Sequence, residues 1–165
     1  MEKTKLVVDI INSIVNTLVL LFGALIGGMW AYCKFGHEEK IIELRNIKSS
    51  LINFRENANL YSFYNHLAST NVMFSENLKT QQFNLETSRS LLKSAFDQSF
   101  YIDMVKKILW QGSLSKWMLE PISELLNEES RRTLSKEITK IEVGIEIEAQ
   151  KHNMFIRRIR NFFRK

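Results

Sequence analysis

The stretch LVVDIINSIVNTLVLLFGALIGGMWAYC, residues 6–33, decides the organisation of the chain. From residue 10 to residue 33 it holds no charged side chain. As an α-helix this run is about 36 Å long, enough to cross a hydrocarbon core of about 30 Å. Trp30 and Tyr32 come near its end, where aromatic residues are typical of a membrane interface. The sequence therefore predicts a transmembrane helix over residues 8–33.

Other N-terminal signals fit this stretch less well. The apolar run is longer than the core of a secretory signal peptide, and no small-x-small cleavage site follows it. Bulky Tyr32 before Cys33 argues against a lipoprotein signal. Basic residues are more numerous after the helix than before it: Lys34, Lys40, Arg45 and Lys48. The positive-inside rule then places the C-terminal part in the cytoplasm, and the single cysteine agrees with a reducing compartment.

The polar residues of the apolar helix fall on one face. On a helical wheel at about 100° per residue they align with two glycines in a single stripe. The members of this stripe are Asp9, Asn12, Ser13, Asn16, Gly23 and Gly27. Small residues let transmembrane helices approach closely, and Asn or Ser side chains hydrogen-bond between them. The stripe predicts that several copies associate, and three or more would line a water path; the alternative is an interfacial Asp9 with incidental glycines.

Residues 36–165 are predicted to form a small helical domain. After the membrane segment, residues 1–35, apolar side chains recur at spacings of three and four: Leu44, Ile47, Leu51, Phe54, Ala58 and Tyr61. This heptad-like pattern predicts a helix over residues 41–68, and only Gly36 interrupts a continuous helix that begins near Lys5. Two interpretations stay open: the seam packs on its own domain, or it is a stalk through which protomers associate.

The second half of the domain is also helical by pattern. Residues 69–84 have no clear period and predict a loop, and helical spacing resumes over 85–111 with Gly112 expected to end that helix. From residue 127 onward apolar residues again share one helical face. Residues 141–148, IEVGIEIE, alternate as a strand would, but the spacing on both sides favours a helix. The fold class predicted is all-α, with one N-terminal transmembrane helix.

Motifs of catalysis are missing from the sequence. It has no phosphate-binding glycine loop, no nucleophile elbow and no zinc-protease helix, and its three histidines are scattered. We therefore expect neither an enzyme nor a bound metal or cofactor. Basic and aromatic residues do cluster along predicted helices: Tyr61, Tyr64, His66, Tyr101, Lys106, Lys107, Arg131 and Arg132. Such residues suit a ligand with phosphates and flat bases, although aromatic stripes more often belong to a core.

The net charge of +5 originates in the last 15 residues, which hold six basic residues and no acid. Its candidate contact residues are Arg157, Arg158, Arg160 and Arg164. They fit anionic lipid headgroups, or phosphates beside stacking aromatics, or a solvated helix end. Because the rest of the chain is nearly balanced, no double-stranded nucleic acid is expected as a partner.

The layout of a transmembrane helix followed by a small helical domain resembles the cyclic-oligoadenylate-binding membrane effectors of type III CRISPR antiphage defence. The resemblance covers the whole chain and rests on layout and size. It implies a homo-oligomer, favouring a tetramer, in a bacterial inner membrane. Its cytoplasmic domain would bind a cyclic oligoadenylate and rearrange the transmembrane helices, forming a pore or disrupting the membrane. The alternatives are a passive anchor that scaffolds a protein partner and a ligand-free protein like a holin or toxin.

Overall fold

The computed structural model describes residues 2–162, with the side chains of residues 10–123, 125–154, 157 and 161. Over these residues the secondary structure is helical, which confirms the all-α prediction. The elements are α1 (Glu2–Thr70), η1 (Val72–Phe74), α2 (Ser75–Gln98), α3 (Met104–Leu119), η2 (Ile122–Leu126) and α4 (Glu128–Phe162). The chain divides into two compact units, Met1–Glu39 and Lys40–Lys165.

The first unit is the N-terminal part of α1. This helix continues through Gly36, which the sequence indicates as an interruption, because a single glycine costs a helix only about 1 kcal/mol. Within α1 an 18-residue window has a mean hydropathy of 2.0, and none of that window is buried. The described chain thus has one helix that is long and apolar enough to cross a membrane.

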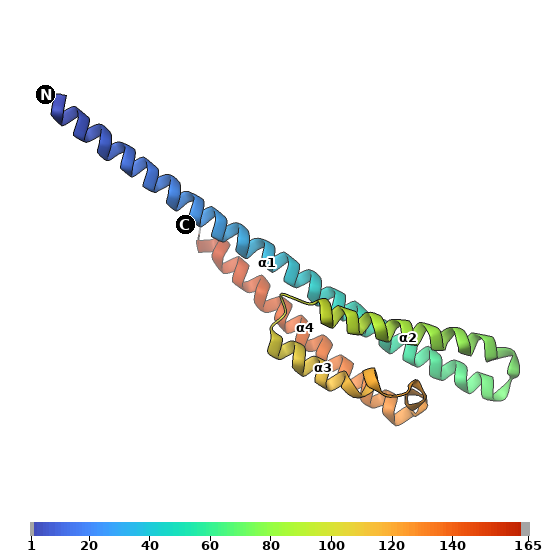
Figure 1. The fold of residues 1–165 in the computed structure, drawn as a ribbon. Helices are drawn as coiled ribbons and strands as arrows, with labels where there is room; N and C mark the ends of the chain where they lie inside the picture. The colour runs from blue at the N-terminus through green and yellow to red at the C-terminus, as the bar shows by residue number, and fades with distance from the viewer. Residues whose placement is uncertain (1, 163–165) are drawn as a thin grey trace. The chain divides into compact units, whose positions relative to one another are not determined.

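The second unit is an up-and-down bundle of four helices, formed by the remainder of α1 with α2, α3 and α4 (Figure 1). All six side chains of the heptad-like seam, from Leu44 to Tyr61, are buried in its core. They pack with Leu85, Leu92 and Phe96 of α2, Leu114 and Trp117 of α3, and Leu134, Ile138, Ile141 and Ile145 of α4. Of the two interpretations of the seam, packing within one chain is the one that this burial supports.

Ion pairs align α4 against α1. In each pair the cation belongs to α1 and the carboxylate to α4, which runs in the opposite direction. The pairs are Lys40–Glu148 at 3.1 Å, Lys48–Glu146 at 2.9 Å and Arg55–Glu142 at 3.0 Å. The middle pair is about half exposed and contributes little, whereas the outer two are largely shielded from water.

The helix boundaries between α1 and α3 differ from the prediction. Only residues 71–74 separate α1 from α2, because Asn71 caps the short η1 turn by accepting a hydrogen bond from the backbone N–H of Met73. The predicted loop over 69–84 is therefore mostly helix. The predicted stop at Gly112 is also wrong: the break falls earlier, where Asp103 caps α3 by accepting from the N–H of Val105.

The ambiguous segment 141–148 lies inside α4, so the preference for helix is confirmed. Its Gly144 has a specific neighbour, the indole of Trp110 in α3. A Cβ at this glycine would lie 3.5 Å from the Trp110 Nε1, an ordinary packing distance. The glycine therefore lets α3 and α4 lie close without being essential for the backbone conformation.

Candidate functional site

The stripe of the apolar helix is exposed wherever the structure describes it. Thr17 donates a hydrogen bond from its hydroxyl to the Ser13 carbonyl at 2.8 Å, which satisfies that polar group within the helix. A Cβ added at Gly23 or at Gly27 would meet nothing within 4 Å, so the space beside both glycines is open. Asn12, Ser13 and Asn16 are exposed, and the Asp9 side chain lies outside the described residues. No described part of the chain covers this face.

Unit 2 holds a buried carboxylate at one end of the bundle. Glu148 of α4 is only 7% exposed and binds lysines from two other helices, with a histidine of its own helix nearby. Lys40 of α1 donates at 3.1 Å, Lys106 of α3 donates to the other carboxylate oxygen, and the His152 Nε2 lies 3.6 Å away. We call these four residues the Glu148 cluster. It ties α1, α3 and α4 together.

The electrostatics of this cluster favour the charged carboxylate. Burial by itself raises the pKa of Glu148, but the hydrogen bonds and charges of Lys106 and Lys40 outweigh it and lower that pKa to about 2. Glu148 is therefore ionised at every physiological pH. An acid that stays charged this firmly is suited to holding helices together and poorly suited to proton transfer near pH 7.

A second carboxylate holds the connection between α2 and α3. Glu43 of α1 accepts hydrogen bonds from the backbone N–H groups of Phe100 at 2.6 Å and Tyr101 at 2.9 Å. Lys107 donates to the Asp97 and Ser99 carbonyls, each at 3.3 Å. The connection is thereby fixed at the same end of the bundle as the Glu148 cluster.

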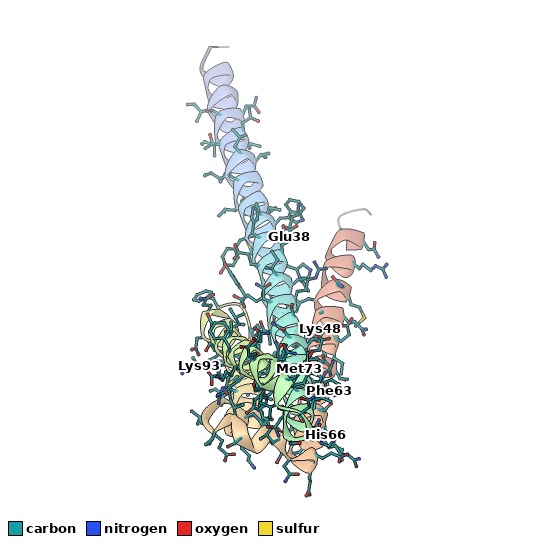
Figure 2. The ribbon with its side chains drawn as sticks, turned by 90° about the vertical axis from the view of Figure 1, so that its right-hand side faces the viewer. Glu38, Lys48, Phe63, His66, Met73 and Lys93 are labelled. Atoms are coloured by element: carbon teal, nitrogen blue, oxygen red, sulfur yellow. The ribbon has the colours of Figure 1, made fainter. Side chains whose placement is uncertain are left out.

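The predicted ligand-binding residues fall into two groups at opposite ends of unit 2. Tyr101, Lys106 and Lys107 lie at the end fixed by Glu43. Tyr61 follows Glu43 by 18 residues on α1, about 27 Å along the helix axis. Tyr64, His66, Arg131 and Arg132 lie with Tyr61 at that far end, and Figure 2 shows His66 beside Phe63 and Met73 near the α1–α2 turn. One chain therefore does not bring the eight residues into one pocket.

Several of these side chains are already engaged. Tyr61 is 7% exposed, so its side chain is part of the core, and burial together with the nearby charge of Glu86 raises its pKa. Arg132 pairs with Glu128 at 2.6 Å. Lys106 belongs to the Glu148 cluster. Arg131 differs, because its Nε is buried without a hydrogen-bond partner among the described atoms.

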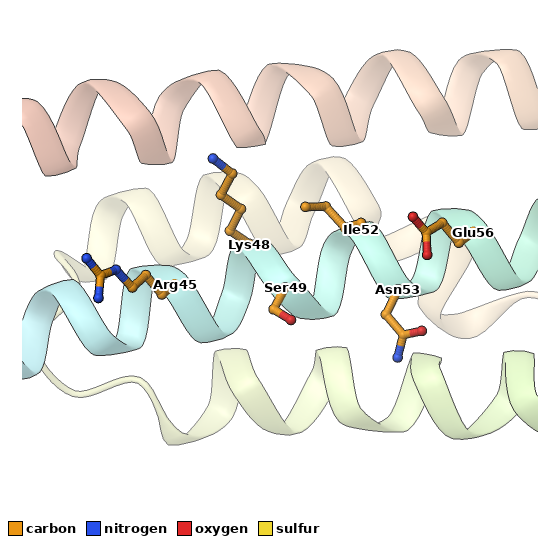
Figure 3. A pocket seen from close by; sticks show the side chains of 6 residues that line it. All are labelled: Arg45, Lys48, Ser49, Ile52, Asn53 and Glu56. Carbon is orange, nitrogen blue, oxygen red and sulfur yellow. The ribbon is translucent and has the colours of Figure 1, made fainter.

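The surface hollows of unit 2 are shallow. The hollow drawn in Figure 3 has a volume of about 350 Å³, and its lining residues all come from α1: Arg45, Lys48, Ser49, Ile52, Asn53 and Glu56. Lys48 reaches toward α4 to pair with Glu146, so this cation is already committed within the chain. Of two further hollows, one is lined by Asn127 and the first turns of α4, and the other is lined by α4 alone. A hollow lined by one helix is open to solvent and unlike the enclosed sites that bury small ligands.

The basic C-terminal segment continues α4 beyond the Glu148 cluster. Arg157 is exposed, whereas the side chains of Arg158, Arg160 and Arg164 lie outside the described residues. Sequence reasoning named this segment and the stripe, but it missed Glu148 and Glu43. Their roles depend on partners 42 to 108 residues away, and no spacing within the chain indicates such pairs.

Comparison of the chain with protein-family models, with curated proteins and with solved structures finds no match.

Proposed function

We propose that the protein is a single-pass membrane effector that acts when copies of its apolar helix assemble through the stripe. The observation that carries the proposal is the unburied apolar window of α1, with its mean hydropathy of 2.0. In water, Phe22 at 62% exposure and Leu20 at 74% would be costly, whereas lipid accommodates them at no such cost. A bilayer is the environment that this surface fits.

Assembly accounts for the polar residues within the apolar helix. Asn12 and Asn16 side chains in lipid gain from a hydrogen-bonding partner, and an identical helix supplies one. The open space beside Gly23 and Gly27 admits a second backbone. Three or more helices meeting on this face would surround a polar path, through which the effector would permeabilise the membrane.

The proposed topology has the bundle in the cytoplasm of a bacterial inner membrane. Lys34, Lys40, Arg45 and Lys48 supply the positive flank after the helix. Lys40 and Lys48 also form ion pairs with carboxylates of α4, and these pairs exist only when unit 2 is folded. The single exposed Cys33 offers a direct reporter of which side this flank occupies.

Gating by a cyclic oligoadenylate belongs to the same proposal. Since the two groups of candidate residues lie at opposite ends of one chain, the ligand site would form between copies, as a tetrameric ring would allow. The Arg131 Nε, buried with no hydrogen-bond partner among the described atoms, is the group in the far-end set that a phosphate would satisfy. A cyclic tetra-adenylate should therefore raise the melting temperature of the full-length protein, and Arg131→Ala should remove that shift.

The test of the effector is a set of matched substitutions on the two faces of the helix. Asn12→Leu, Asn16→Leu and Gly23→Leu together should leave insertion intact and abolish dye leakage from expressing cells. The control exchanges Ile11→Leu, Ile14→Leu and Leu25→Ile on the opposite face and should leak like the natural sequence. Equal leakage from both variants would rule out assembly through the stripe.

A passive anchor that scaffolds a protein partner is the second candidate. It is favoured by the exposed apolar side chains of the α1–α2 turn, Val72 at 81% and Met73 at 82% exposure. Such an anchor should tolerate the triple leucine variant without loss of function, because any apolar helix of this length would hold it in the bilayer.

A further inference from the structure

Helix α3 is apolar on two faces, and only one of them is buried in its own chain. Leu114 and Trp117 face the core, while Trp110 packs on Gly144. The other face is exposed: Met104 at 75%, Val105 at 64%, Ile108 at 61% and Leu109 at 63%, with Phe100 at 84% just before the helix and Leu119 at 81% at its end. We call these six residues the outer face of α3. A large exposed apolar patch of this kind marks an interaction surface.

The outer face carries little charge along its length. Lys106 pairs with Glu148 in the core-facing cluster, and Lys107 binds the end of α2. Asp103 caps the start of α3, and Lys116, the exposed cation beside the face, pairs with Glu120 at 3.7 Å. With its one exposed cation paired, such a face can meet its own copy with little like-charge repulsion.

Gly112 lies at the centre of this face and has no structural explanation within the chain. Nothing lies within 4 Å of the position its Cβ would take, whereas the corresponding position at Gly144 meets Trp110. A mid-helix glycine costs about 1 kcal/mol relative to alanine. A second helix packed closely at Gly112 would explain why a glycine occupies this position despite its cost to helix stability.

The size of the face fits a second copy of the chain. Six large apolar side chains at these exposures present on the order of 800 Å², which matches the area each partner contributes to a standard protein interface and exceeds the usual largest patch of a monomer. A lipid surface is the alternative occupant, and the cross-linking experiment below distinguishes it from a second copy.

The geometry points to the outer face of α3 as a homotypic interface, through which two copies of the chain pack α3 against α3 around Gly112. Chains inserted in one direction into one membrane are related by an axis along its normal, so this symmetry rests on the proposed membrane insertion. The interface itself does not depend on the stripe.

Disulfide cross-linking of the full chain in native membranes tests the interface. With Cys33→Ser as background, Ile108→Cys and Gly112→Cys place a single thiol on the outer face. Lys93→Cys, on the exposed side of α2 (Figure 2), is the matched control. Mild oxidation should give at least five-fold more covalent dimer from the two outer-face variants than from the control.

Two further variants distinguish a failure of the proposed α3 interface from a failure of the proposed effector function. Adding the triple leucine variant of the stripe should leave the Ile108→Cys cross-link in place even where leakage is lost. In the natural background, Ile108→Glu should reduce the dimer seen by native mass spectrometry without changing helical content, since that side chain is exposed. Equal cross-linking at all three positions, or capture of a photoreactive lipid in place of a dimer at Ile108, would overturn the inference.

Discussion

Glu148 is the residue whose chemistry most directly links the sequence to the stability of the bundle. It is nearly buried, yet it stays ionised because two lysines from different helices share its oxygens. Removing one member of such a group leaves the remaining charges partly buried without compensation, which costs more than the pair itself contributes.

Glu148→Gln should destabilise unit 2 by about 2 kcal/mol at pH 7, because it replaces charge-assisted hydrogen bonds to Lys40 and Lys106 with neutral ones. Urea unfolding of the full chain in detergent, followed by tryptophan fluorescence, measures the change. Glu146→Gln is the matched control on the same helix. Its exposed pair with Lys48 should be worth less than about 0.5 kcal/mol.

The same carboxylate should make the protein sensitive to acid. Its pKa falls from 4.5 to about 2 on folding, so its contribution is fully present above pH 4.5 and is lost as the pH falls toward 2. Unfolding free energies measured between pH 5 and pH 2.5 should decline in the natural protein more steeply than in Glu148→Gln. Parallel curves for the two proteins would show that Glu148 is not the linked group.

Gly144 is a position at which a substitution should increase the stability of the protein. An alanine Cβ would lie 3.5 Å from the Trp110 indole, in ordinary contact, and alanine is the better helix former by about 1 kcal/mol. Gly144→Ala should therefore raise the free energy of unfolding by up to about 1 kcal/mol. Gly144→Leu should lower it, because the larger side chain would displace Trp110. Thermal unfolding of the two variants distinguishes these effects.

At the scale of elements, the connection between α2 and α3 depends on a side chain of α1. Glu43→Ala removes the acceptor of two backbone hydrogen bonds, at Phe100 and Tyr101. Hydrogen exchange at these two amides should accelerate at least ten-fold, while amides in the middle of α2 should change little. Unchanged exchange at both amides would mean that Glu43 does not hold this connection.

The helices also show which sequence patterns were sufficient to predict the fold. The spacing from Leu44 to Tyr61 identified the apolar residues that α1 buries, because a helix in a bundle buries a fixed angular stripe. Gly112 misled the prediction because helix propensity is weak beside packing, and the real boundary depends on the cap at Asp103. The candidate ligand-binding residues form two groups that lie about 27 Å apart along the bundle. Within each group the spacing is helical, but this spacing does not predict where the two groups lie relative to each other in the folded chain.

For the whole molecule, the apolar helix should control where the protein resides. The full chain should remain in the membrane pellet after an alkaline carbonate wash. A chain lacking residues 2–35 should be released to the supernatant with helical circular dichroism, because unit 2 has a core of its own. Release of the full chain by the wash would contradict membrane insertion.

The antiparallel course of α4 has a consequence for the distribution of charge. Three of its acids, Glu142, Glu146 and Glu148, pair with cations of α1, whereas the part of α4 after Gln150 holds basic residues and no acid. The pairing of Glu148 with Lys40 sets this part of α4 at the end of the bundle where α1 enters it. That end of unit 2 therefore carries an excess of positive charge, which would attract an anionic surface before any contact forms.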